Sequence, residues 1–84
     1  MKPAQAVTAT AHSLSAAMLL WELWHQGHRS GCEIGRNPRG FEGRYLLNGR
    51  LLFSYQFETF SEAIDWAQHR AAAMRRRGWQ GRAA

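Results

Sequence analysis

Three side chains with hydrolytic chemistry lie four residues apart near the C-terminus: Ser61, Asp65 and His69. They supply the hydroxyl, carboxylate and imidazole of a hydrolytic triad. Such a triad needs the imidazole between the other two groups, together with an oxyanion site. The i, i+4, i+8 spacing instead aligns all three along one face of a helix. We therefore expect a solvated helix face rather than a catalytic centre.

A second candidate is the string His25, His28 and Cys32, whose side chains are of the types that bind zinc. A structural zinc site takes four ligands, so the fourth would have to be His12, His69 or a carboxylate, and the sequence has no second paired cluster. We expect two turn histidines and a small buried thiol, with no metal and no cofactor.

Two carboxylates, Glu33 and Glu42, could face one another across a hairpin, but each lies among arginines. Ion pairing is then favoured over acid–base catalysis. Nothing in the sequence predicts an enzyme.

The clearest functional signal is positive charge. The 84-residue chain has 11 Lys and Arg against 6 Asp and Glu, a net charge of +5, and no acid follows Asp65. Arg forms bidentate contacts with phosphate or carboxylate and stacks on aromatic rings. The predicted partner-binding surface lies on and after the C-terminal helix and comprises Trp66, Arg70, Arg75, Arg76, Arg77 and Trp79. A secondary basic surface comprises Arg36, Arg39, Arg44 and Arg50.

This surface has three interpretations. It could bind an acidic protein or a ribonucleoprotein, it could contact nucleic-acid phosphates directly, or its arginines could simply be solvated. Sequence-specific DNA reading is disfavoured, because the C-terminal helix has no partner helix at a short turn and its first turn is acidic.

Size and composition indicate a single domain spanning residues 1–84, with a loosely ordered start at 1–12 and a frayed tail at 80–84. The single cysteine excludes an intramolecular disulfide and favours a cytoplasmic setting. The longest apolar run, Ala16–Trp21, is too short to cross a bilayer, so we expect no membrane association.

Turn-forming clusters recur about every ten residues, the rhythm of an antiparallel meander. Residues 31–36 predict a strand with Cys32 and Ile34 facing inward. Residues 41–47 and 51–57 alternate as a hairpin around Asn48-Gly49. To place Tyr45 and Phe53 on one face, we expect a three-residue loop that includes a left-handed residue.

The C-terminal helix begins with a capping box, Thr59 followed by Glu62, and Gly78 is a plausible stop. Its apolar stripe should pack on the aromatic face of the sheet. The stripe comprises Phe60, Ala63, Ile64, Ala67, Ala71 and Met74.

Residues 13–26 fit either a helix or, over 20–26, a strand. As a strand, the segment would point Trp21 and Trp24 to opposite faces, with at least one in the core.

The strings Leu20-Trp21-Glu22-Leu23, Asn37-Pro38-Arg39-Gly40-Phe41-Glu42 and Arg77-Gly78-Trp79 resemble a class of small uncharacterised bacterial and prophage proteins over about residues 20–79. The resemblance implies a strand at 20–26, a short N-terminal helix confined to about residues 11–18, and no known catalytic residue.

We therefore expect an α+β protein with a three- or four-stranded antiparallel meander and a C-terminal helix on one face. Its small size and prophage character are similar to those of phage inhibitors such as anti-CRISPR proteins. That analogy implies a non-catalytic inhibitor that binds a host protein or ribonucleoprotein, as a monomer or weak dimer. The alternative is a basic nucleic-acid-binding accessory protein.

Overall fold

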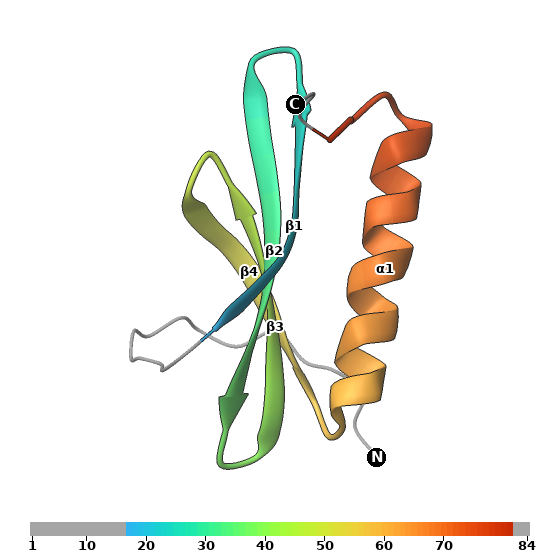
Figure 1. The fold of residues 1–84 in the computed structure, drawn as a ribbon. Helices are drawn as coiled ribbons and strands as arrows, with labels where there is room; N and C mark the ends of the chain where they lie inside the picture. The colour runs from blue at the N-terminus through green and yellow to red at the C-terminus, as the bar shows by residue number, and fades with distance from the viewer. Residues whose placement is uncertain (1–16, 82–84) are drawn as a thin grey trace.

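The computed structural model describes residues 17–81, which form one sheet and one helix (Figure 1). The strands pair antiparallel in the order β1-β2-β3-β4, which confirms the predicted meander and fixes its strand number at four. The elements are β1 (Met18–His25), β2 (His28–Asn37), β3 (Gly40–Leu47), β4 (Arg50–Phe57) and α1 (Phe60–Arg76).

Residues 20–26, which the sequence left ambiguous, lie mostly in strand β1. The strand alternation points successive side chains to the two faces of the sheet. Trp21 packs against the core while Trp24, three residues on, pairs along the outer edge. The short N-terminal helix expected at 11–18 lies outside the described residues except at its end, where Met18 already opens β1.

The loop between β3 and β4 has two residues, so the expected three-residue loop is wrong. Leu47 lies opposite Arg50, and both Asn48 (φ 53°) and Gly49 (φ 83°) adopt the left-handed conformation. A register shift between Tyr45 and Leu46 leaves Leu52 as an extra residue on β4. This β-bulge, rather than a longer loop, brings Tyr45 opposite Phe53 as predicted.

Helix α1 begins with the predicted capping box. The Thr59 hydroxyl accepts a hydrogen bond from the Glu62 amide, and the Glu62 carboxylate accepts one from the Thr59 amide. Arg77 is the C-cap residue of α1. Gly78 follows with a positive φ of 103°, a conformation that favours glycine.

The helix lies lengthwise over one face of the twisted sheet (Figure 1). Its small side chains allow close approach: Ala63, Ala67, Ala71 and Met74 are buried, Ile64 is partly buried, and Phe60 stays 42% exposed. Phe60 nevertheless packs edge-on against Phe41, with ring centroids 5.5 Å apart. The predicted stripe is therefore confirmed along its centre and is open at its first residue.

The chain after α1 returns to the sheet. Gln80 exchanges two backbone hydrogen bonds with Trp24, at 2.8 and 3.0 Å, and so closes part of the outer edge of β1. Of the tail expected to fray at 80–84, Gln80 is therefore held by the sheet; residues 82–84 lie outside the described part.

Candidate interaction surface

The predicted surface divides into side chains used for folding and side chains left at the surface. Trp66 packs against Tyr55 and Phe57, with ring centroids 5.8 and 5.6 Å away. Its ring also fills the space beside Gly43, where an added Cβ would come within 2.6 Å of it. Trp66 thus packs α1 against β3 and β4.

Arg70 is also committed to the fold. Its guanidinium carbon lies 4.5 Å from the Tyr45 ring centroid and 4.9 Å from that of Phe53, and these two rings stack on each other. Both contacts are within cation–π range. The Arg70 Nε atom is buried and has no hydrogen-bond partner among the described residues. The ring faces are therefore the chief partners of this cation.

Trp79 completes the packing at the C-terminal end of the helix. It packs against the core cluster formed by Leu23, Tyr45, Ala71 and Met74. Its ring lies 5.4 Å from that of His25, centroid to centroid. The predicted tryptophan anchors are thus half-buried structural contacts.

Arg75, Arg76 and Arg77 are exposed where α1 ends. The partial negative charge of a helix C-terminus stabilises cations at this position. Consecutive helical residues are turned about 100° from one another. The three side chains therefore spread around the helix end instead of forming one stripe.

Two further exposed arginines lie at this end of the molecule. The β1–β2 and β3–β4 turns both lie at the end where α1 finishes, whereas the β2–β3 turn lies at the opposite end (Figure 1). Arg29 and Arg50 are exposed beside these two turns. We call the resulting group of five the basic end: Arg29, Arg50, Arg75, Arg76 and Arg77.

The two turns of the basic end are fixed to each other. The Arg29 amide donates to the Asn48 side chain (2.9 Å), and the Asn48 amide donates to the Arg29 carbonyl (2.6 Å). The Asn48 side chain also contacts the His28 ring at 3.1 Å. Arg29 and Arg50 are thus carried on a braced pair of turns.

The basic end holds few acids. Arg29 is 3.8 Å from Glu22, and this is the one ion pair that the described residues give to any of its five arginines. Such exposed pairs contribute little. The cluster therefore retains most of its positive charge.

The secondary basic surface does not form one patch. Arg36 and Arg39 lie at the other end, exposed beside the β2–β3 turn, and Arg36 lies 5.7 Å from the Phe41 ring centroid. Arg50 belongs to the basic end.

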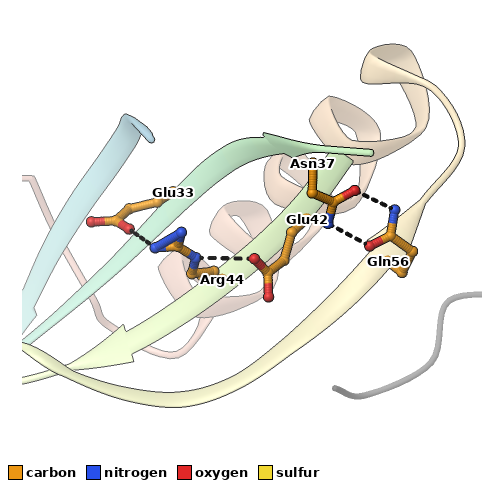
Figure 2. A network of polar contacts seen from close by, with 5 residues as sticks. All are labelled: Glu33, Asn37, Glu42, Arg44 and Gln56. Atoms are coloured by element: carbon orange, nitrogen blue, oxygen red, sulfur yellow. Dashed lines mark hydrogen bonds and ion pairs between the residues drawn. The ribbon is translucent and has the colours of Figure 1, made fainter. Parts of the chain in front are cut away.

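Arg44 is neutralised on the sheet face away from the helix (Figure 2). It lies between Glu33, at 3.2 Å, and Glu42, at 3.4 Å, which confirms ion pairing for these two carboxylates. Next to this network, the side chains of Asn37 and Gln56 exchange hydrogen bonds of 2.8 and 3.2 Å. This part of the face presents paired rather than free charge.

The three residues with hydrolytic side chains lie on the surface of α1. Ser61, Asp65 and His69 are exposed, and the His69 ring contacts the Asp65 backbone carbonyl at 2.8 Å rather than its carboxylate. Residues 17–81 bring no three His, Cys, Asp or Glu side chains together as a metal site. Cys32 is fully buried.

Sequence reasoning missed Arg29 as a member of the basic end. The signal was present in the turn order, because alternate turns of a meander lie at the same end of the sheet. The turns at 26–27 and 48–49 are alternate, which places Arg29 beside Arg50 and leaves Arg39 at the far end.

Fold and surface together define a small α+β protein with an aromatic core and a cluster of exposed arginines at one end. No protein-family model, curated protein or solved structure matches the chain. Within residues 17–81, the single helix is too short and too polar to cross a membrane.

Proposed function

We propose that this chain is a small non-catalytic inhibitor of the phage or prophage type. In this proposal it binds a host protein or ribonucleoprotein complex and blocks that complex's access to nucleic acid. The observation that carries the proposal is the basic end: five exposed arginines on one helix end and two braced turns, with a single weak ion pair.

The charge of the basic end specifies the chemistry of the partner. Guanidinium groups bind carboxylates and phosphates through paired N–H donors. The arginines would block a groove that normally receives nucleic acid by binding its acidic rim or the phosphates of its own RNA. Arg75, Arg76 and Arg77 reach outward over a wide angle, which suits such a concave, charged surface.

The core contacts revise which residues would carry binding. Trp66, Arg70 and Trp79 hold the helix and the tail in place, so we assign them a positioning role. Arg75, Arg76 and Arg77 remain as contact residues, joined by Arg29 and Arg50.

The alternative is direct binding of nucleic acid by the same arginines. The exposed guanidinium cluster supports phosphate contact equally well. However, the sheet aromatics that could stack on bases face the helix, as the Tyr55–Trp66 and Tyr45–Arg70 contacts illustrate. Direct binding would then rest on the phosphate backbone alone.

A tagged chain recovered from host lysate, with and without nuclease, tests the proposal. We expect a nuclease-resistant partner that is retained by the wild type and lost by the double variant Arg75→Glu/Arg76→Glu. The matched control is Arg36→Glu/Arg39→Glu, which makes the same change of charge at the opposite end.

Circular dichroism must show that both variants are folded. Material that disappears with nuclease would favour the nucleic-acid alternative. Equal retention of the partner by both variants would refute the basic end as the binding surface.

A further inference from the structure

Two histidines lie within the basic end. His25 and His28 are opposite each other in the β1–β2 ladder and flank the turn that joins these strands. His28 directly precedes Arg29, a member of the basic end. Imidazole is the side chain that gains a proton between about pH 8 and pH 5, whereas guanidinium groups stay charged. The charge of the basic end can therefore change within this range of pH.

His25 connects the β1–β2 turn to the end of the helix. Its ring packs on Trp79, with ring centroids 5.4 Å apart. A Cβ added to Gly78, the residue after Arg77, would come within 2.9 Å of the His25 ring. The imidazole therefore lies where α1 ends, next to the residues that carry the helix-end arginines.

His28 connects the two braced turns. The Asn48 side-chain oxygen accepts a hydrogen bond from the Arg29 amide, so the Asn48 side-chain nitrogen, which only donates, faces the Nδ1 atom of His28 at 3.1 Å. His28 then carries its ring proton on Nε2 and is neutral. Protonation of Nδ1 would end this one exposed contact. The hydrogen bond from the Asn48 amide to the Arg29 carbonyl would remain, so the turns would stay braced.

Among residues 17–81, neither ring is neutralised by an acid. The ion pairs of this part of the chain all join arginines to glutamates, and Glu22, the acid at this end, pairs with Arg29. A proton gained by His25 or His28 therefore adds positive charge instead of forming an internal pair. The charged groups around the two rings are the arginines of the turns and of the helix end: Arg29, Arg50, Arg75, Arg76 and Arg77.

We propose that His25 and His28 are part of the anion-binding surface and make its affinity depend on pH. This inference rests on the proposed function of the basic end. A bound anion stabilises the charged form of a neighbouring imidazole, so binding and protonation favour each other. The affinity for an anionic partner therefore increases as pH falls from 8 to 6, because each protonated ring adds a cation to the contact.

The test is isothermal titration calorimetry of the full chain with sucrose octasulfate at constant ionic strength. The sulfate groups of this probe stay ionised between pH 8 and pH 6, so a change of affinity with pH comes from the protein. We expect binding to be roughly fivefold tighter at pH 6, about the effect of two exposed charge pairs. Binding should also take up protons, which a comparison of buffers with different ionisation enthalpies measures. An affinity that does not change with pH would overturn the proposal.

Glutamine variants assign the response to the two rings. His25→Gln/His28→Gln should bind as the wild type does at pH 8 and lose most of the increase at pH 6. His28→Gln alone should lose part of it. Because His28 is exposed, the single variant tests the proposal even if loss of the His25–Trp79 contact unfolds the double variant. An undiminished pH response in these variants would count against the proposal.

The matched control is His69→Gln. His69 is exposed about two turns before α1 ends, and its ring contacts the Asp65 carbonyl. This variant should keep the full pH response. Loss of the response here would show that the titrating group lies outside the basic end.

The variant Arg75→Glu/Arg76→Glu, measured with the same probe at pH 8, separates this inference from the proposed function. Weaker binding by this variant, together with no pH response in the wild type, would refute the role of the histidines alone. Unweakened binding would refute the basic end as an anion-binding surface, on which both proposals depend.

Discussion

Arginine serves three different purposes in this molecule, and its surroundings decide which. Arg70 lies on two stacked rings, Arg44 lies between two carboxylates, and Arg75 and its neighbours face solvent. Only the third group can make new charge-assisted contacts without breaking existing ones. The total number of arginines therefore overstates the number available for the proposed contacts.

Cys32 provides a pH-dependent test at the residue scale. Burial raises the pKa of its thiol from 9.0 to about 12, against a smaller lowering by the Arg70 guanidinium. The folded state therefore keeps the proton that the unfolded chain releases above pH 9. Stability contributed by this difference is complete below pH 9 and is lost as pH rises toward 12, at up to about 1.4 kcal/mol per pH unit.

The prediction is checked by denaturant unfolding between pH 8 and pH 11. Cys32→Ala lowers stability at pH 8 but has no thiol to titrate, so the advantage of the wild type should shrink as pH increases. Comparison of the two proteins removes the effect of tyrosine and lysine titration. Parallel stability curves would contradict the assignment.

At the scale of elements, the contact between α1 and β3 depends on one missing side chain. A Cβ at Gly43 would lie 2.6 and 2.8 Å from two carbons of the Trp66 ring and 3.1 Å from Phe57. Within a strand, alanine is normally more stable than glycine by about 0.5–1 kcal/mol. Here the overlap dominates, and we expect Gly43→Ala to lower the free energy of unfolding by about 1–3 kcal/mol.

Gly31→Ala is the matched control. It lies in the neighbouring strand β2, and the nearest atoms to an added Cβ are at ordinary contact distances of 3.6 Å or more. We expect this variant to be as stable as the wild type or slightly more stable in urea unfolding. Equal effects of the two substitutions would mean that Trp66 yields without cost.

Local chemistry made part of the fold predictable. The capping box and the left-handed Asn48-Gly49 turn depend on residues within four positions of each other, so their signals survive in sequence. The bulge at Leu52 does not, because it follows from matching two strands across the sheet. Its omission led to the wrong loop length.

The candidate site was less predictable because it also depends on contacts between residues far apart in the sequence. The sequence assigned Trp66 and Arg70 to a partner-binding surface, but both pack on rings of the sheet, and which rings they meet depends on strand register. The ion pairs of Arg44 likewise join residues on separate strands. Turn parity could have located Arg29, whereas the loss of Arg44 from the basic surface required the three-dimensional structure.

At the scale of the whole molecule, exposed positive charge is concentrated at one end. The basic end collects five exposed arginines, with Glu22 as an ion-pair partner of Arg29, whereas Arg36 and Arg39 lie at the opposite end. The aromatic core fixes this distribution, because Trp66 and Arg70 set where the helix lies and therefore where it ends. In the proposed function, binding and folding thus use neighbouring residues of one helix for separate tasks.

The tail after α1 connects the end of the helix to the first strand, β1, and Trp79 anchors the tail there. The side chain packs on the core cluster and on His25, and the next residue, Gln80, pairs with Trp24. Replacing Trp79 by alanine should remove the packing and release the edge of β1 together. Because the ring is only partly buried, we expect a loss of about 2 kcal/mol, below the ~3–5 kcal/mol of a fully buried aromatic.

Gln80→Ala is the matched control in the same tail. It keeps the backbone hydrogen bonds to Trp24 and the packing of Trp79, so it should be nearly neutral. In thermal unfolding, Trp79→Ala should lower the Tm by roughly 10 °C, since 1 kcal/mol corresponds to about 4–8 °C in a domain of this size. Hydrogen exchange at Trp24 should accelerate in the same variant, because the amide loses its partner carbonyl. An unchanged Tm with fast exchange at Trp24 would show that the tail covers the edge without stabilising the fold.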